Sequence, residues 1–422
     1  MSIADSRERI VARDVLSGDV VAITIKEDRI VSLERETAGF RQVSDDRLPW
    51  IAPALCDIQV NGYGGHDFTA PDVSPEDVWA VAEKMFAAGV TRFLPTITTH
   101  SREVMIHAVR TIAQAVNEYP PLVDAIPGIH LEGPYISPED GPRGAHPREH
   151  VRPPDWEEFC QLQEAAAGLI RLITLSPEYP EAVPFIETAV ANGVIVAIGH
   201  TAATSRQLEE AVSAGAQLST HLGNGCHLML PRHPNYLWHQ LADDRLWASF
   251  IFDGHHLPQD FMMVALRAKG IARSILISDV TALAGMPPGI YRTPLGEVEM
   301  LPEGRLVVAG QRQLLAGAAQ PLVTGVVNAI RLTGCSVADA FRMASVNPRA
   351  LLGLPPVVFQ PGASPEFILL DVNPELVNDQ LFPRSERTKK AALWSESGMV
   401  CMEEEPVLKI QKVYFQGERY PL

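Results

Sequence analysis

The chain has 422 residues, of which 46% are hydrophobic and 20% charged, with a formal net charge of −16. This composition is typical of a globular protein with one large core and room for a smaller second domain. The negative charge argues against a nucleic-acid partner, because no basic field exists to release counterions from phosphates. The sequence contains no apolar run of membrane-spanning length and no signal-peptide core, so we expect no membrane association.

The two ends of the chain carry β-strand patterns. Residues 12–34 form short alternating runs joined by Ser-Gly-Asp and Glu-Asp turns. The C-terminal segments PEFILLDVN and PVLKIQKVYFQG alternate in the same way. The simplest arrangement is one small β-sandwich domain built from both termini, covering residues 1–50 and 352–422.

Between these ends, residues 51–351 alternate strand-like and helix-like segments. Helix starts are indicated by Ser74-Pro75 and by Thr204, which forms a capping box with Gln207. Eight strands in this alternation close most naturally into a TIM-type (β/α)₈ barrel. A doubly wound sheet is the rival, but no G-x-G-x-x-G follows the first strand. The apolar runs are 51–60, 91–97, 125–131, 169–175, 194–198, 217–221, 247–252 and 274–278.

Polar side chains cluster at the ends of these runs, where barrels of this kind place their active sites. A glutamate with two histidines suits zinc and leaves a position open for water. An unliganded aspartate beside such a water can take its proton. The strand-end residues are Gln59, Asn61, His130, Glu132, His200, His221, Asp253, His255, His256 and Asp279.

Six motifs follow one another along the chain: HLEGPYIS, GHTAATSRQLEEAVSAGA, STHLGN, DGHH, SDVTALAGMPPGIY and LLAGA. Through them the chain resembles the N-acetylglucosamine-6-phosphate deacetylases of the amidohydrolase superfamily. The resemblance extends from the first barrel strand to PGASPEFILLD. It implies a metal-dependent barrel with a β-sandwich made by both termini. It also implies hydrolysis of N-acetylglucosamine 6-phosphate to glucosamine 6-phosphate and acetate.

The resemblance also assigns roles to residues. It implies that Glu132, His200 and His221 bind the metal and that Asp279 is catalytic. It implies contacts to the sugar phosphate from a further set, which is His146, Asn224, Gly225, Arg232 and His256. In the family the arginine reaches the neighbouring subunit's site, which implies a homodimer. His130 is interpreted as structural, and the motif register favours His256 rather than His255 as the functional member of that pair.

The first barrel strand ends in Gln59 and Asn61, where many amidohydrolases have His-x-His and bind a second metal. Neutral carboxamides are poor zinc ligands compared with imidazole. Some deacetylases of this family carry the same Gln-x-Asn and use one metal. We therefore predict one divalent ion per chain, with zinc favoured, and a site-shaping role for Gln59 and Asn61.

The chain departs from the family pattern around the substrate pocket. After STHL the family reads Tyr/Phe-Asn-Ala-Met, whereas this chain reads Gly-Asn-Gly-Cys. The next stretch, HLMLPRHPNYLWHQL, carries aromatic and histidine residues where the family has small ones, and Leu-Ala-Gly-Ser becomes Leu-Ala-Gly-Ala. Two alternatives therefore stay open. One is a sibling enzyme acting on another N-acetyl sugar, phosphorylated or not, or on an N-acyl amino acid. The other is a non-catalytic assembly protein, against which the complete metal set argues.

The five cysteines are widely spaced, with no Cys-x-x-Cys motif. An odd number at such spacing indicates reduced thiols rather than a disulfide framework, which predicts a cytoplasmic protein. Cys226 is interpreted as an inert buried thiol. The others are Cys56, Cys160, Cys335 and Cys401.

Overall fold

The computed structural model describes residues 7–35, 48–293, 296–372, 394–395, 398–399, 408–416 and 418–420. By their contacts these residues divide into two compact units. One lies within residues 1–56, 85–91 and 326–422, and the other within 57–84 and 92–325. The predicted domain boundaries at residues 50 and 351 stay a prediction. None of the described helices is long and apolar enough to cross a membrane.

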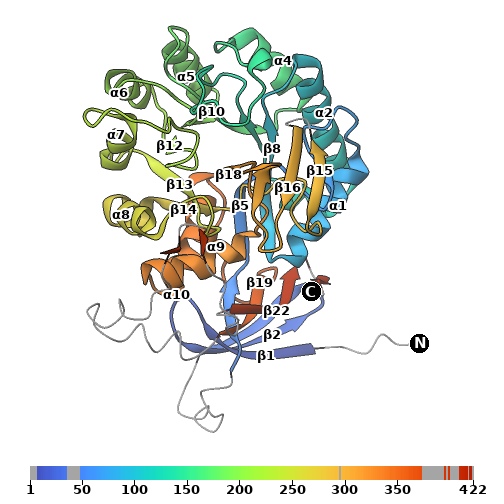
Figure 1. Ribbon diagram of the computed structural model, residues 1–422. Coiled ribbons are helices and arrows are strands. Elements are labelled where there is room, and N and C mark those ends of the chain that lie inside the picture. The colour runs from blue at the N-terminus through green and yellow to red at the C-terminus, as the bar shows by residue number, and fades with distance from the viewer. Residues whose placement is uncertain are drawn as a thin grey trace. The chain divides into compact units, whose positions relative to one another are not determined.

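An eight-stranded sheet forms the barrel, and its strands follow one another in chain order (Figure 1). The ladders from β8 to β14 are parallel. A parallel bridge between Val60 and Val280 joins the first strand to the segment after the last. The predicted (β/α)₈ barrel is therefore confirmed. Its strands are β5 (Leu55–Val60), β8 (Val90–Thr98), β9 (Ile129–Glu132), β10 (Ile170–Leu175), β11 (Ile195–Ile198), β12 (Leu218–Ser219), β13 (Trp247–Ile251) and β14 (Ser274–Ile277).

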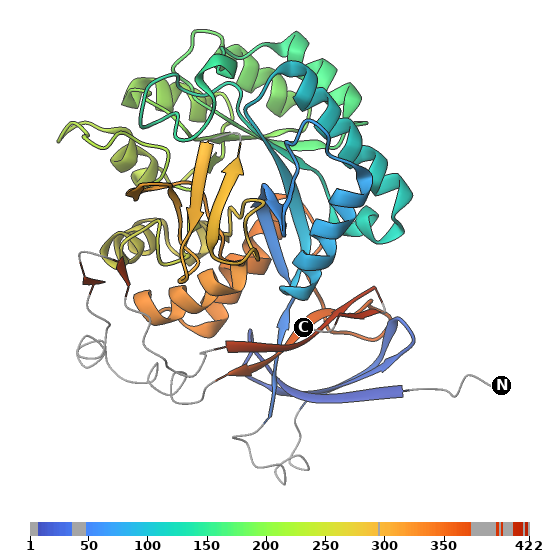
Figure 2. The same ribbon diagram turned by 45° about the vertical axis from the view of Figure 1, so that its right-hand side comes forward.

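Helices α1 to α8 alternate with the strands and lie on the outside of the barrel (Figure 2). Both predicted helix starts are confirmed: the Ser74 hydroxyl accepts the N–H of Asp77 at 3.2 Å, and Thr204 and Gln207 form the capping box. The helices are α1 (Pro75–Ala87), α2 (Arg102–Glu118), α3 (Pro120–Ala125), α4 (Trp156–Ala165), α5 (Ala182–Ala191), α6 (Ser205–Ser213), α7 (Tyr236–Ala242), α8 (Gln259–Lys269), α9 (Leu322–Asn328), α10 (Val337–Phe341) and α11 (Asn347–Leu351). Short helical turns are η2 (Arg148–His150), η3 (Ile271–Arg273), η4 (Ala329–Thr333) and η5 (Arg342–Val346).

The run predicted as one strand over residues 51–60 is in fact two strands in different sheets. β4 (Trp50–Pro53) pairs antiparallel with β19 (Glu366–Val372), whereas β5 belongs to the barrel. Backbone partners change at this point, because Ala54 N–H donates to Glu366 and Leu55 N–H donates to Gly89. The pattern of apolar residues cannot reveal the break, since both strands are buried. The predicted run at 125–131 likewise begins late, because Ala125 ends α3.

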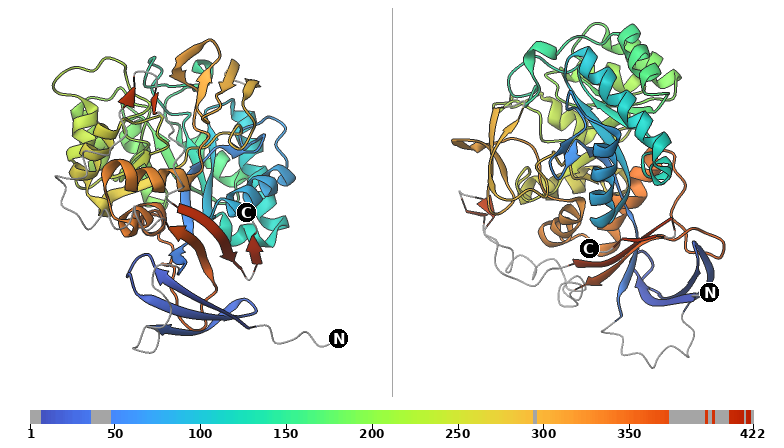
Figure 3. Two further views of the ribbon diagram at one scale, coloured as in Figure 1. Left: turned by 60° about the horizontal axis from the view of Figure 1, so that its bottom comes forward. Right: turned by 90° about the vertical axis from the view of Figure 1, so that its right-hand side faces the viewer.

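Strands from both ends of the chain pair in one seven-stranded sheet, as expected for a shared terminal domain. In Figure 3 the blue N-terminal and red C-terminal strands belong to this one sheet, in which β4 pairs with β19. Alternate residues of one face, among them Ile10, Ile23 and Phe367, form a single buried core. The remaining strands of this sheet are β1 (Arg7–Asp14), β2 (Val20–Lys26), β3 (Arg29–Arg35), β22 (Leu408–Phe415) and β23 (Glu418–Tyr420).

A four-stranded antiparallel sheet follows the last barrel strand and was not predicted. Its strands are short, and β15 has no buried residue, so the sequence pattern resembles that of a loop. They are β15 (Gly289–Thr293), β16 (Gly296–Met300), β17 (Leu306–Val308) and β18 (Gln311–Leu315). Two small hairpins complete the described strands: β6 (Gly62–Tyr63) with β7 (His66–Asp67), and β20 (Trp394–Ser395) with β21 (Gly398–Met399).

Candidate active site

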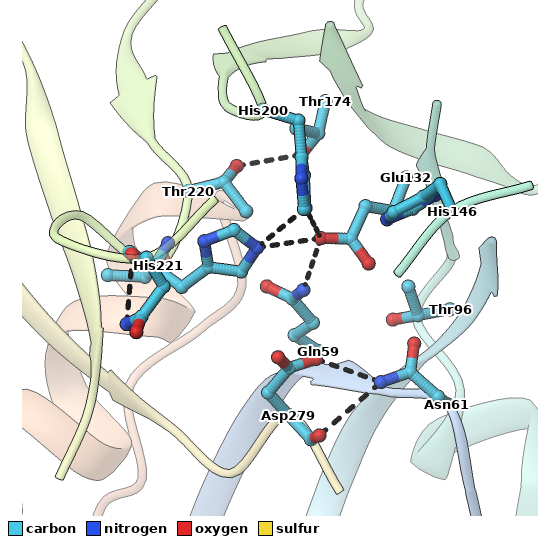
Figure 4. Close-up of polar contacts among 12 residues, drawn as sticks. Gln59, Asn61, Thr96, Glu132, His146, Thr174, His200, Thr220, His221 and Asp279 are labelled. Carbon is cyan, nitrogen blue, oxygen red and sulfur yellow. Dashed lines mark hydrogen bonds and ion pairs between the residues drawn. The ribbon is translucent and has the colours of Figure 1, made fainter. Parts of the chain in front are cut away.

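Three predicted metal ligands converge on one point at the carboxyl ends of the barrel strands (Figure 4). Glu132 is the last residue of β9, whereas His200 and His221 each follow their strand by two residues. Glu132 Oε1 lies 3.1 Å from His200 Nε2 and 2.8 Å from His221 Nε2. The two Nε2 atoms are 3.0 Å apart. All three side chains are buried.

His200 is held in a fixed orientation by its surroundings. Its Nδ1–H donates to the carbonyl of Pro142 at 2.8 Å, which leaves the Nε2 lone pair facing Glu132. The ring lies between two loops that approach it through glycines. A Cβ on Gly144 would lie 3.2 Å from the ring and one on Gly225 only 2.8 Å, so a side chain at Gly225 would collide with it.

The buried carboxylate of Glu132 is stabilised by positive charge at this position. Burial alone would raise the pKa of Glu132, but the hydrogen bonds and charges of both histidines hold it well below its usual value. Burial would lower the pKa of His221, but its hydrogen bond to Glu132 and that charge raise it. Two imidazole nitrogens and a carboxylate oxygen that share one point fit a divalent cation, and zinc prefers such donors.

The backbone at the cluster is strained. His200 has φ +48°, His221 +29° and Asp279 +53°, although none of them is glycine. Left-handed backbone costs roughly 1–3 kcal/mol at a residue with a Cβ and is held only where surrounding contacts enforce it. Such strain is concentrated at functional sites, and here it turns three side chains from the strand ends toward the same point.

Gln59 and Asn61 donate hydrogen bonds to the two carboxylates of the site. Gln59 Nε2 donates to Glu132 Oε1 at 2.8 Å, and Asn61 Nδ2 donates to Asp279 Oδ1 at 2.8 Å. Each carboxamide thus holds one carboxylate of the site in place, and the nitrogen that it presents cannot bind a cation.

Asp279 lies after β14, and its backbone N–H donates to the carbonyl of Gln59 at 3.1 Å. Burial and the charge of Glu132 raise its pKa to about 6. A carboxylate poised near neutral pH can exchange a proton with a reacting group. Asp57 lies two residues before Gln59 on β5 and therefore on the same face of the strand. It is fully buried and accepts hydrogen bonds from the Ser278 hydroxyl and backbone N–H. Sequence reasoning missed Asp57, although its parity matches that of Gln59.

His146 reaches the cluster from the loop after β9. Its Nδ1 lies 2.8 Å from Thr99 Oγ1, and its ring centroid is 4.5 Å from that of His200. Burial lowers the pKa of His146 to about 3, so the ring is neutral. Thr99 was not predicted either, although it directly follows the polar end of β8.

The other predicted substrate residues lie on two loops. His256 Nδ1 contacts Asp253 Oδ2 at 2.7 Å, and Asp253's charge outweighs the effect of burial and raises the pKa of His256. The Asn224 N–H donates to the His221 carbonyl at 2.9 Å. Arg232 is exposed, and the structure brings it into no contact with the metal cluster among the described residues.

His130 lies one layer below the cluster and is a satisfied core histidine. Its Nε2 lies 2.8 Å from Thr174 Oγ1, and its Nδ1 lies 3.1 Å from the Ile58 carbonyl. Burial lowers its pKa to about 4. Cys226 is only half-buried and its thiol is free, and burial raises its pKa.

Residues 50–400 match the model of the amidohydrolase family. The chain belongs to the amidohydrolase family. Members of this family are metal-dependent hydrolases, in agreement with the Glu132, His200 and His221 cluster.

Relatives of this amidohydrolase include sugar-phosphate deacetylases. It is 34% identical over 367 residues to the N-acetylglucosamine-6-phosphate deacetylase of Bos taurus, covering 82% of this chain and 87% of that one. It is also 34% identical over 324 residues to the N-acetylgalactosamine-6-phosphate deacetylase of Escherichia coli O157:H7, covering 76% and 83%.

Among solved structures, the amidohydrolase resembles a mutant N-acetyl-D-glucosamine-6-phosphate deacetylase from Mycobacterium smegmatis, solved in complex with N-acetyl-D-glucosamine-6-phosphate. The TM-score is 0.80 at 26% identity, over 99% of this chain and 100% of that one.

Proposed function

We propose that the chain removes the acetyl group from N-acetylglucosamine 6-phosphate, giving glucosamine 6-phosphate and acetate. The observation that carries this is the buried Glu132, His200 and His221 cluster with Asp279 beside it. The deacetylase relatives support the choice of substrate.

In this proposal Glu132, His200 and His221 hold one divalent ion, and zinc suits the two imidazoles and one carboxylate. When bound, the ion supplies Lewis acidity that brings the pKa of water toward neutrality. Gln59 and Asn61 shape the site and take the place of a second pair of ligands. Metal analysis of purified protein is expected to give one equivalent per chain, and two equivalents would contradict this assignment.

Asp279 is the proposed proton carrier. As a carboxylate it accepts the proton of the attacking water, and it then returns that proton to the departing amine nitrogen. The hydrogen bond from Asn61 orients the Asp279 carboxylate. Asp279 therefore acts first as a base and then as an acid from the same position.

His146 is proposed to bind the sugar. Thr99 donates toward the Glu132 carbonyl at 3.4 Å and therefore accepts from His146 Nδ1–H. The neutral ring then presents Nε2 as an acceptor, which suits a sugar hydroxyl.

The 6-phosphate is proposed to meet Arg232, His256 and the backbone at Asn224-Gly225. An arginine fork and backbone amides are favourable donors to an anion, and Asp253 favours the charged form of His256. Arg232 would act in its own site or, in a homodimer, in that of the neighbour. Leu228 and Met229, which are 90% and 87% exposed on the same loop, favour a covered interface.

A second candidate substrate is N-acetylgalactosamine 6-phosphate, because the relative acting on it is as similar as the N-acetylglucosamine-6-phosphate deacetylase. We also propose a cytoplasmic location, which is supported by the odd number and wide spacing of the five cysteines in the sequence.

The deciding experiment measures acetate release from four compounds by enzyme of known zinc content. They are the two N-acetylhexosamine 6-phosphates, unphosphorylated N-acetylglucosamine, and an N-acetyl amino acid. We expect the highest kcat/KM with N-acetylglucosamine 6-phosphate. Preference for the amino acid, or equal rates with and without phosphate, would contradict the proposed substrate.

A further inference from the structure

Two loops meet over the metal ligand His200. The first follows β9 and carries His146, and the second follows β12 and carries Asn224 and Arg232. Gly144 of the first loop and Gly225 of the second both contact the His200 ring closely enough that a Cβ would crowd it. The loops also touch each other, since a Cβ on Gly141 would lie 3.0 Å from the Cα of His227.

A chain of hydrogen bonds ties the same two loops together at their outer edge. His227 Nε2 lies 2.9 Å from Glu139 Oε2, and His227 Nδ1 lies 3.0 Å from the Tyr236 hydroxyl. The backbone N–H of His227 also donates to that hydroxyl, at 2.8 Å. Every group finds its partner when the Tyr236 hydroxyl donates to Nδ1 and Nε2–H donates to Glu139. Burial raises the pKa of Tyr236 to about 12, so its hydroxyl keeps its proton.

We propose that His227 is a positioning residue for substrate, which locks the loop of His146 to the loop of Asn224 through Glu139 and Tyr236. This inference rests on the proposed function. His227 and Tyr236 lie in the stretch HLMLPRHPNYLWHQL, where the sequence departs from the family pattern.

Such a lock acts on binding rather than on chemistry. The two loops supply contacts to the sugar phosphate, and fixing them beforehand removes an ordering cost from substrate binding. Asp279 and Glu132 lie at the ends of barrel strands, and among the described residues neither forms a direct hydrogen bond with Glu139, His227 or Tyr236. Loss of the lock should therefore raise KM and leave kcat unchanged. The effect is modest because the side chains of Glu139 and His227 are 59% and 28% exposed.

The test uses the full-length, zinc-loaded enzyme and four variants: His227→Ala, Glu139→Ala, their double mutant, and Tyr236→Phe. The matched control is His233→Ala, an exposed histidine of the same loop. With N-acetylglucosamine 6-phosphate, we expect each single substitution to raise KM by about fivefold with kcat within about twofold of wild type. The double mutant should be no worse than either single mutant, because both remove the same link.

A second measurement does not require a substrate. Hydrogen exchange of the amides in residues 137–147 should be faster in His227→Ala than in wild type and unchanged in His233→Ala. Unchanged exchange, unchanged KM, or KM effects that multiply in the double mutant would overturn the lock. If wild-type enzyme of full zinc content were inactive, the proposed function would be refuted instead. The hydrogen-exchange result would still show whether His227 holds the two loops together.

Discussion

Among the described residues, two groups of carboxylates and histidines have donor atoms close enough to share a cation, and one of these two has the character of an active site. Glu132, His200 and His221 are buried at the ends of barrel strands. The second group is Glu209 on α6, His239 on α7 and Asp243 directly after α7, of which Glu209 is exposed and the other two are half-buried.

The carboxylates of the second group are already paired with a positively charged side chain, that of Arg245. Arg245 contacts the two oxygens of Glu209 at 3.0 and 2.7 Å, and it reaches Asp243 at 2.6 Å. This bidentate pairing raises the pKa of Arg245 and lowers that of both carboxylates. Within the described part of the chain, no such guanidinium contacts the buried cluster, where Glu132 pairs with two histidines and a carboxamide. Spacing of ligand atoms is thus insufficient, and burial without a neutralising side chain distinguishes a metal site.

The largest effect is expected from removing one ligand of each group. Glu132→Ala takes the only carboxylate from the buried ligand set, so zinc content and deacetylase activity should both fall to background. Glu209→Ala is the matched control and should keep both. Metal analysis by plasma mass spectrometry, with acetate release, checks this. Loss of zinc from the Glu209 variant alone would reverse our assignment of the two groups.

Asp279→Asn separates metal binding from proton transfer in the buried site. Asparagine keeps the shape and leaves Glu132, His200 and His221 intact, so zinc content should match that of wild type. The group that carries the proton is lost, and kcat should fall by about 10²- to 10⁴-fold. Near-normal turnover in this variant would exclude Asp279 as the general base.

Much of this site could be predicted from the sequence. The apolar runs indicate where the barrel strands end, and Glu132, His200 and Asp279 lie at those ends. The three left-handed residues could not, because no glycine marks their positions. The contacts of Thr99 with His146 and of Glu139 with His227 join loops from different strands, and no local pattern encodes such pairs. The division of residues 51–60 into β4 and β5 also depends on partners far along the chain.

The pH dependence of kcat should report the buried environment of Asp279. Burial and Glu132 raise its pKa to about 6, whereas a bound cation favours the carboxylate and lowers it. The base works when ionised, so activity is present above this pKa and is lost as pH falls through it. We expect an acid limb at or below pH ~6. Asn61 stabilises the carboxylate, so Asn61→Ala should move this limb to higher pH and lower kcat a few-fold. A limb that stays in place would show that another group titrates.

The smallest expected effect comes from attempting to convert the second group into a metal site. Arg245→Ala removes the guanidinium and leaves Glu209, Asp243 and His239 with donor atoms within 4.8 Å of one another. A second zinc equivalent should then bind, but weakly, because Glu209 is exposed and its side chain must be ordered on binding. Zinc titration by calorimetry, with wild type and Arg245→Ala/His239→Ala as controls, measures this. A second equivalent in wild type would show that Arg245 does not exclude the ion, and none in Arg245→Ala would show that burial alone separates the two groups.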